Sequence, residues 1–436
     1  MSTAHVPLVV SQTTTPELAA YYADRPQVWR NIWYLMSCRV GWDFVFNIVG
    51  PLMLLRLSTV GVSTGTIGLI GSINSWAMSI LVMYFSWRSD HTVSRLGRRL
   101  PFLLVSAPFI IITTALFPFF ATPTNLIILY VVQILFMDLK NSTFALIPID
   151  IAPRAELARF QSLYAIIGGF ITFVAMFWGF RSTSVAPWLP YVAGAVIMVF
   201  TTWSGMRIRE PPIQAPTMEK WRPWTTLAVG FRDRRMILLM LAVAMIGSFS
   251  GVYGAWMWLF AAKQLGLDAQ TIGPALAPAA LIPVLLGWPI GWLIDKVGGL
   301  KVSIGYVFIM LGTCYLVTTA QTRVDIIWMS ILATISSVLS WGPGMIILKL
   351  CPVKDVGSIT STSAFVRNIY GGVMMCGTGY LIDFCGGNYR PVFVAGMVMS
   401  VIGLVLLFVY RDLMDKGGAM KTAPDVSQAT RGGRIN

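Results

Sequence analysis

The sequence predicts an all-α polytopic membrane protein with twelve transmembrane helices in two pseudo-symmetric six-helix bundles. Three observations support this fold class. Hydrophobic residues make up 56% of the 436 positions and charged residues only 11%, which is too apolar for a soluble chain of this length. The apolar residues gather in blocks long enough to cross a bilayer. A basic hairpin motif also recurs at corresponding positions of the two halves.

The apolar blocks follow one another along the whole chain. A helical crossing needs ~20 predominantly apolar residues, and about twelve blocks reach this length. We place the spans at residues 32–56, 64–86, 101–121, 125–148, 161–181, 187–206, 235–262, 272–294, 302–320, 325–350, 359–384 and 390–411.

These spans divide the chain into five regions. We expect a cytoplasmic N-terminal segment (1–30), an N-terminal six-helix bundle (31–206), a cytoplasmic central linker (207–234), a C-terminal six-helix bundle (235–411) and a cytoplasmic tail (412–436). The linker is rich in proline and basic residues and lacks a span-length apolar run. Residues 1–30 lack the apolar core of a cleavable signal, so the first span is expected to direct insertion.

The net charge of +14 reflects membrane topology rather than nucleic-acid binding. Most Lys and Arg fall on segments that share one side of the membrane, as the positive-inside rule predicts when both termini are cytoplasmic. The exceptions on the other side are Arg56, Arg181, Lys263, Arg323 and Arg390. We expect a bacterial inner-membrane protein embedded in the lipid bilayer, without a nucleic-acid partner.

The second and third spans are joined by a basic hairpin, Trp87 to Phe102. Its four arginines cannot lie in hydrocarbon, so the hairpin must lie at the cytoplasmic membrane surface. The segment Gly287 to Lys301 occupies the same place in the second half. There Asp295, Lys296, Gly298 and Lys301 repeat the order of Asp90, Arg95, Gly97 and Arg98, which indicates an internal duplication.

Both hairpins are predicted to gate the cytoplasmic face, with Asp90 and Asp295 contacting arginines or helix N-termini. The loop Pro148 to Arg159 after the fourth span is either simply solvated or in contact with the first hairpin across the inner surface. The remaining predicted gating residues are Arg99, Arg154, Glu156 and Arg159.

The first span carries three polar residues, Arg39, Asp43 and Asn47, at intervals of four, so they share one helix face. Ionisable groups are costly in lipid, and this face should therefore line a cavity between the helices. The alternative is an Arg39–Asp43 ion pair that only stabilises the helix.

The fourth span carries Gln133, Asp138, Lys140 and Asn141. Asp138 and Lys140 are two residues apart and point to roughly opposite helix faces, so only one of them lines a cavity squarely. The sequence leaves open which one does.

The second half has its own candidate binding residues. Span seven is interrupted by glycines beside Tyr253 and Trp256, which either pack or contact a solute. Trp341 begins a W-G-P-G sequence whose kink would free backbone carbonyls toward a cavity. Arg367 lies about a third of the way into its span, and we predict that it binds substrate or takes part in coupling.

The paired halves and hairpins resemble the major facilitator superfamily. The stretch S-D-H-T-V-S-R-L-G-R-R-L-P-F is similar to the loop of its glycoside-pentoside-hexuronide cation symporters, the group of melibiose permease, and of the related plant sucrose transporters. A-L-I-P-I-D-I-A-P-R-A-E-L-A-R-F and F-V-R-N-I-Y-G-G resemble that group too, as does the acidic Asp43 in the first span. This resemblance implies sugar transport by alternating access.

The second span departs from the melibiose permease pattern because it carries Asn74 and no carboxylate. We therefore expect coupling to a proton at Asp43 or Asp138 rather than to sodium, since a carboxyl group removed from water can load and release a proton.

The sequence thus predicts a symporter of a sugar, glycoside or uronide that works as a monomer without a cofactor or bound metal. Arg39, Lys140 and Arg367 also permit small organic anions, carboxylates or sulfonates, as substrates. A non-transporting membrane receptor or assembly factor is a further alternative. An enzyme is not expected, because His5 and His91 are the only histidines and no catalytic set or metal-ligand cluster is present.

Overall fold

The computed structural model describes residues 16–92, 94, 96–144, 147–151, 157–211, 222–339 and 356–416. Within these residues the chain is helical and contains no strand. This confirms the predicted all-α class.

The helices of the N-terminal half follow the predicted spans closely. Their bounds are α1 Pro16–Ala23, α2 Arg25–Phe44, η1 Val45–Val49, α3 Gly50–Thr59, α4 Thr64–Asp90, α5 Leu100–Leu116, η2 Phe117–Phe119, α6 Pro123–Phe144, α7 Ile147–Ile151, α8 Leu157–Val174, η4 Ala175–Gly179, η5 Arg181–Ser184 and α9 Leu189–Gly205.

The C-terminal half begins after the central linker. Its helices are α10 Pro223–Phe231, α11 Arg234–Ile246, α12 Ser248–Leu259, η6 Phe260–Gln264, α13 Ala269–Leu276, η7 Ala277–Leu281, α14 Ile282–Val297, α15 Gly299–Thr319, α16 Arg323–Leu339, α18 Val356–Phe384 and α19 Arg390–Lys416.

Each predicted span coincides with helix over most of its length. In the described part of the chain, nine continuous helical stretches are long and apolar enough to cross a membrane. The sixth span corresponds to the shorter apolar helix α9. The tenth and eleventh predicted spans correspond to α16 and α18. Neither helix meets the length criterion and the apolar-composition criterion together. The count of twelve crossings and the domain boundaries therefore stay predictions.

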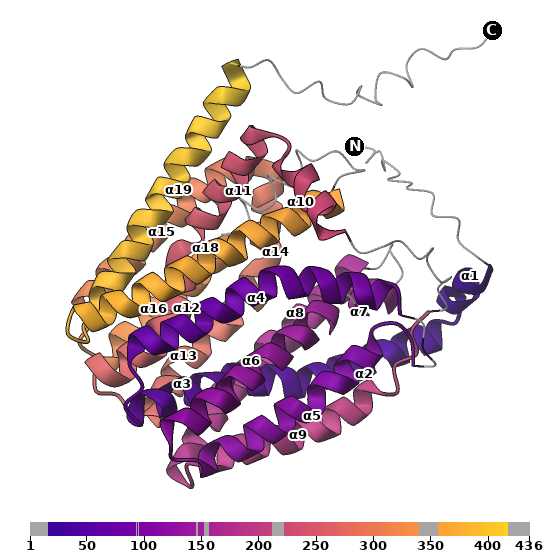
Figure 1. Cartoon of the computed structure of the whole chain (residues 1–436), viewed down its shortest axis with the longest axis horizontal. Helices are drawn as coiled ribbons and strands as arrows, with labels where there is room; N and C mark the ends of the chain where they lie inside the picture. The colour runs from indigo at the N-terminus through magenta and orange to yellow at the C-terminus, as the bar shows by residue number, and fades with distance from the viewer. Residues whose placement is uncertain are drawn as a thin grey trace.

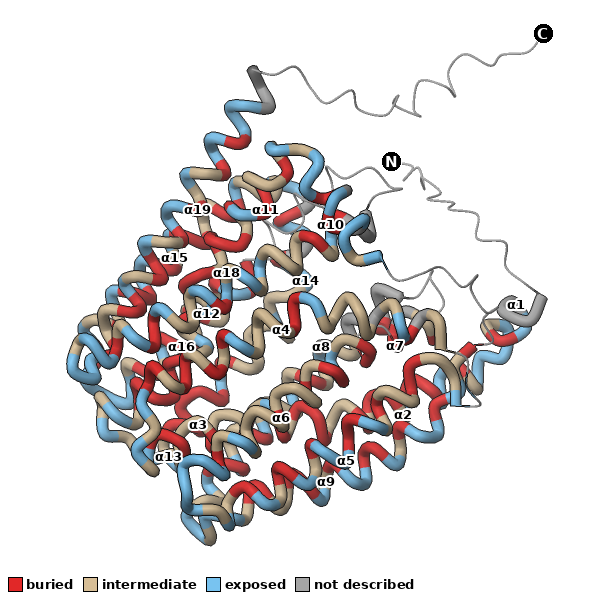
Figure 2. The backbone as a smooth tube through the Cα atoms, viewed as in Figure 1, coloured by how far each residue is buried: buried red, intermediate tan, exposed pale blue. Residues whose placement is uncertain are grey.

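Exposed residues lie along the outer helices of the bundle (Figure 2), and many of them are large and apolar. Among the exposed large side chains are Trp288, Phe308 and Phe384, with exposed fractions of 80%, 68% and 89%. Such a surface would be unstable in water but suits contact with lipid chains, where every backbone polar group is satisfied inside a helix.

The two halves meet at one end of the molecule, where α4 and α18 lie side by side (Figure 1). We call this the closed end; it contains Ser58, Thr64 and Asp383. Toward the opposite end, where α9 ends and α10 begins, α4 and α18 diverge (Figure 1). We call this the linker end.

A second contact between the halves joins the turns η4 and η5 to α13. The ring of Phe180 stacks on Trp258 with centroids 4.7 Å apart. A side chain at Gly273 would meet Phe180 at 2.4 Å, so glycine is required for this close approach. The helices of the two halves are therefore held together by interlocking apolar surfaces as well as by polar groups.

Candidate functional site

A cavity of about 800 Å³ lies between the two halves. Its lining comes from η1, α3, α4, α6 and η4 on one side and from α11, α12 and α18 on the other. Cavities of this size hold small molecules with most of their surface buried. Among the predicted binding residues, those in its lining are Asn47, Gln133, Asp138, Asn141 and Arg367.

The acidic centre of the cavity is Asp138 on α6. Its carboxylate accepts a hydrogen bond of 2.7 Å from the Asn74 side-chain amide on α4. The Asn74 carbonyl oxygen is buried and has no hydrogen-bond partner among the described residues. The Asn74 amide thus holds the Asp138 carboxylate in place, and its carbonyl oxygen remains available as a hydrogen-bond acceptor near the cavity. Asn74 lies in the second span, where the resemblance to melibiose permease would place an acidic residue. Sequence reasoning noted Asn74 but did not predict it as a site residue.

Two further amide side chains belong to the N-terminal wall. Asn47 lies in the π-helical turn η1 and donates to the Asp43 carbonyl and to the Thr172 hydroxyl, at 2.7 and 3.1 Å. Single π-turns inserted in α-helices are frequent at functional sites. Gln133 is 2% exposed and donates to the Thr114 hydroxyl at 3.0 Å, so it also holds α6 against α5.

The C-terminal wall is more apolar and carries one cation, Arg367 on α18, among the described lining residues. Tyr370 lies one turn further along and shares a 2.7 Å hydrogen bond with Ser248. Trp258 completes this wall with its indole ring. Sequence reasoning identified Arg367 but missed the other three, because hydroxyl and aromatic groups in an apolar span do not reveal which helix face meets the cavity.

A smaller cavity of about 290 Å³ lies within the N-terminal half, beside α2, α6 and α8. Arg39 and Asp43 line it and form an ion pair of 2.7 Å. The Arg39 guanidinium also donates to the Tyr164 carbonyl at 2.5 Å and lies 3.7 Å from the centroid of the Tyr164 ring. The ion pair is formed and it also faces a cavity, and the binding role of the two residues stays a prediction. Asn141 lines both cavities.

Lys140 points away from the larger cavity, and so the structure assigns that cavity to Asp138. The Lys140 side chain is fully buried, with its ammonium nitrogen 3.4 Å from the Trp42 ring centroid and 4.3 Å from that of Phe144. This nitrogen has no hydrogen-bond partner among the described residues. Cation–π contacts compensate part of the cost of burying it.

Two predicted binding residues of the C-terminal half do not line either cavity. Trp256 is fully buried and its indole N–H donates to the Thr378 hydroxyl at 2.9 Å. Tyr253 packs against Phe249 and Phe393. In this conformation both serve packing, the alternative considered from the sequence. Trp341 lies outside the described residues.

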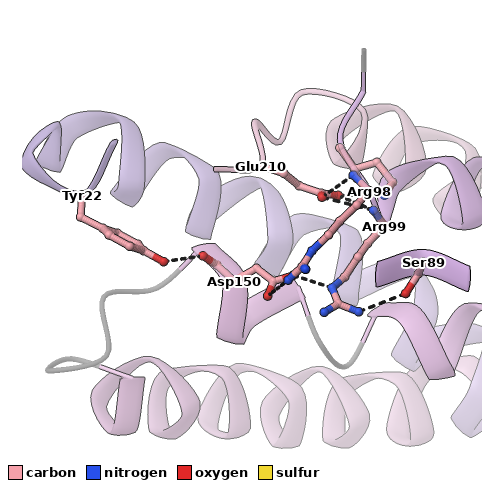
Figure 3. Close-up of polar contacts among 7 residues, drawn as sticks. Tyr22, Ser89, Arg98, Arg99, Asp150 and Glu210 are labelled. Carbon is pink, nitrogen blue, oxygen red and sulfur yellow. Dashed lines mark hydrogen bonds and ion pairs between the residues drawn. The ribbon is translucent and has the colours of Figure 1, made fainter. Parts of the chain in front are cut away.

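The first hairpin forms a polar cluster with the start of α5 (Figure 3). Arg98 and Arg99 both bind the carboxylate of Asp150 on α7, the former at 2.6 Å. The Tyr22 hydroxyl donates to the Asp150 carbonyl at 2.8 Å. The loop after the fourth span therefore contacts the hairpin through Asp150, rather than being only solvated.

Glu210 completes this cluster from the chain that follows α9 (Figure 3). Its carboxylate accepts from the backbone N–H groups of Arg98, Arg99 and Leu100, which begin α5. Burial raises the pKa of the Glu210 carboxyl, while these N–H donors act in the opposite direction. A side chain at Gly97 would meet this carboxylate at 2.6 Å, and Gly97 has a φ of 109°. The cluster contains no residue of the C-terminal six-helix bundle, and Glu210 lies at the start of the predicted central linker.

The other predicted gating residues have varied positions. Gly298 has a φ of 92°, so the two hairpins share a left-handed glycine turn. Lys296 and Lys301 are exposed, and Lys296 lies 4.7 Å from the Trp292 ring centroid. Arg95, Arg154 and Glu156 lie outside the described residues, as do the side chains of Asp90, Arg159 and Asp295. Their gating role stays a prediction.

The sequence pattern of the Major Facilitator Superfamily matches residues 35–375. The chain belongs to this superfamily. This membership agrees with the expectation of a membrane transporter rather than an enzyme. In the part of the chain that the structure describes, no group of three or more His, Cys, Asp or Glu residues could hold a metal ion.

Known transporters resemble the chain in sequence or in fold. The uncharacterized transporter YybO of Bacillus subtilis (strain 168) is 30% identical over 199 residues, which cover 42% of this chain and 45% of that protein. The chain thus matches less than half the length of this relative. The nucleoside transporter NupG has a TM-score of 0.74 at 12% identity, covering 88% of this chain and 99% of its own.

A bacterial homologue of the human lysosomal transporter Spinster, solved in an inward-facing and unoccupied conformation, has a TM-score of 0.65 at 14% identity. The similarity covers 93% of this chain and 99% of that protein. These structural similarities establish the shared fold.

The Arg39 guanidinium occupies space that only a glycine at position 168 leaves open. A Cβ there would meet the guanidinium atoms at 2.0 to 2.6 Å. Gly168→Ala should therefore displace Arg39 and lower the unfolding free energy by about 1–3 kcal/mol. A lower melting temperature of the detergent-purified variant checks this. Gly287→Ala is the control, since a Cβ there meets nothing within 4 Å; equal effects of both changes would contradict the packing described.

Asp150→Asn should destabilise the protein, because it leaves two largely buried arginines without their shared carboxylate. Breaking a buried ion pair costs about 3 kcal/mol. The melting temperature should fall well below that of Asp24→Asn, which changes an exposed N-cap into another good N-cap residue. Equal melting temperatures for the two variants would show that the cluster contributes nothing to stability.

Proposed function

We propose that the protein is a secondary active transporter that moves a sugar, glycoside or uronide by alternating access, as a proton-coupled symporter. The observation that carries this proposal is the cavity between the two halves, with Asp138 and four amide side chains on one wall and Arg367 on the other. In transporters of this architecture, the substrate site lies near the membrane midplane between the repeats.

The chemistry of the cavity suits a polyhydroxylated solute. Carboxylate and amide oxygens accept hydrogen bonds from hydroxyl groups, and amide nitrogens donate to them. Asn47, Asn74, Asp138 and Asn141 supply such groups from three helices. The rings of Tyr130 and Trp258 offer apolar faces to the carbon skeleton of a solute. The resemblance of the basic hairpin to the glycoside-pentoside-hexuronide symporters supports the same substrate class.

The arrangement of the halves supports alternating access. The charged contacts between them, made by Asp383 and Lys263, lie at the closed end. Further along α4, the Ser72 hydroxyl and the Trp76 indole N–H donate to carbonyls of α18, and beyond them the two helices diverge toward the linker end (Figure 1). With the linker in the cytoplasm of a bacterial cell, this conformation is inward-facing. Rocking one half against the other would close the linker end and open the opposite end.

Proton coupling is proposed at Asp43 or Asp138. Asp138 has an amide neighbour but no ion-pair partner in the described chain, whereas Asp43 is neutralised by Arg39. A carboxylate without a cation, partly removed from water, takes up a proton more readily than a paired one. Asp138 is therefore the stronger candidate for the proton site, and Asp43 the alternative.

Thermal-shift measurements on the purified protein should find a neutral sugar, glycoside or uronide that raises the melting temperature, because a ligand that binds the folded state stabilises it. Uptake of that compound into proteoliposomes should then follow an imposed pH gradient. Asp138→Asn should lose accumulation but keep exchange of labelled for unlabelled solute. Asp268→Asn, an exposed change, is the control. Uptake indifferent to the pH gradient would contradict proton coupling.

Small organic anions are a second candidate substrate class, favoured by the surplus of positive charge in the N-terminal half. Arg39 and Lys140 lie near a single carboxylate, Asp43, and the buried Lys140 amine has no acceptor in the described chain. An anion could supply the missing charge. If gluconate raises the melting temperature more than glucose does, and Lys140→Met removes the difference, the anionic class is supported. A greater effect of glucose, unchanged in Lys140→Met, would exclude it.

A further inference from the structure

Asp383, near the C-terminal end of α18, binds the N-terminus of α4 in the other half of the molecule. Its carboxylate accepts from the backbone N–H groups of Thr64 and Gly65, at 3.2 and 2.7 Å, and from the Thr64 hydroxyl. The first N–H groups of a helix have no partner within the helix. Ser63 caps the N–H of Thr66 at 3.1 Å, so the start of α4 is satisfied jointly by its own N-cap and by Asp383.

Lys263 makes the complementary contact. Located in η6 of the C-terminal half, it donates to the backbone carbonyl of Ser58 at 3.0 Å, near the end of α3. The last carbonyls of a helix also lack partners within the helix. The C-terminal half thus places an anion on the positive end of one helix dipole and a cation on the negative end of another. Both targets lie on the same hairpin, between α3 and α4.

The glycines of this interface make the contact possible. A Cβ at Gly65 would meet the Asp383 carboxylate at 2.7 Å and the Tyr380 ring at 2.9 Å. A Cβ at Gly68 would meet the Met375 carbonyl at 2.6 Å, and one at Gly379 the Thr64 carbonyl at 2.7 Å. Backbone therefore approaches backbone directly, which fixes the distance between α4 and α18 at the closed end.

We propose that Asp383 and Lys263 are positioning residues of the transport cycle, which hold the closed end shut by binding opposite helix ends of the α3–α4 hairpin. This inference rests on the proposed alternating access. The contacts join the two halves, so they must break whenever the closed end opens. Both residues are already exposed in this conformation. The carboxylate and the ammonium therefore stay solvated when the contacts break, and this keeps the opening reversible.

The test is a pair of distances measured by electron spin resonance in lipid nanodiscs. Spin labels on exposed positions 124 and 270 report on the closed end, and labels at 206 and 232 report on the linker end, in a cysteine-free background. In Asp383→Asn, an amide NH2 group replaces one of the two carboxylate oxygens. This group is a donor and cannot accept a hydrogen bond from the Gly65 N–H. The population with the closed end open should rise about fivefold, the factor expected for loss of one helix cap. Lys263→Met should shift it in the same direction.

Two matched controls separate gating from general loss of stability. Asp325 caps the start of α16 through Gln321 and Thr322, within the C-terminal half. Arg390 donates to the Ala320 carbonyl, also within that half. Asp325→Asn and Arg390→Gln should leave both distances unchanged. Gly65→Ala gives an independent check, since its methyl group should force the closed end apart and shift the distances as Asp383→Asn does.

If the wild-type protein samples two pairs of distances and Asp383→Asn does not shift them, or shifts them no more than Asp325→Asn does, the gating role is wrong while alternating access stands. If the wild-type protein keeps one pair of distances at acid and neutral pH, with and without solute, alternating access itself fails and the inference falls with it. Restoration of the wild-type distribution by Asp383→Glu would support a charge-dependent latch.

Discussion

The structure is governed by the cost of placing charge in an apolar helix bundle. A polar group buried without a partner costs free energy, and a charge costs more. Four ionisable groups between the helices of the N-terminal half meet this constraint in different ways: Arg39 and Asp43 pair, Asp138 takes an amide neighbour beside a cavity, and Lys140 lies over aromatic rings. The two cavities lie where these groups gather.

The same constraint explains the ends of the helices. The N-terminus of α5 is satisfied by Glu210, which follows α9 closely in the chain, and the N-terminus of α4 by Asp383 from the other half. Both are carboxylates on free backbone N–H groups, yet the consequences differ. The Glu210 contact can persist when the two bundles move relative to each other as rigid bodies. The second contact joins two bundles, and can persist in only one arrangement of them.

The fold could be predicted from the sequence because hydrophobic block length and loop charge are local properties. The helices follow the predicted spans, and the glycine turns at Gly97 and Gly298 fit the predicted duplication. The site was harder to predict. Helix periodicity tells which residues share a face of a helix, but it does not tell which face lines a cavity. Asp138 and Lys140 could not be separated by sequence, and Tyr370 and Trp258 were not predicted as site residues.

Long-range partners were also beyond the sequence. The contact of Asp383 with Thr64 is one example, since nothing near either residue in sequence reveals that the two lie side by side. Likewise, Glu210 follows a helix with no motif of its own, and its role depends on backbone more than one hundred residues away. Contacts with backbone N–H groups leave no complementary residue type to recognise.

The central claim, that one aqueous cavity is exposed alternately to the two sides of the membrane, is tested most directly by labelling. A single cysteine at position 141, which lines both cavities, is treated with a membrane-impermeant thiol reagent in vesicles of each orientation. Alternating access predicts labelling from the cytoplasmic side in the conformation described, and from the opposite side when the closed end is opened by Gly65→Ala. A cysteine that reacts from neither side, or from one side only in both proteins, would contradict it.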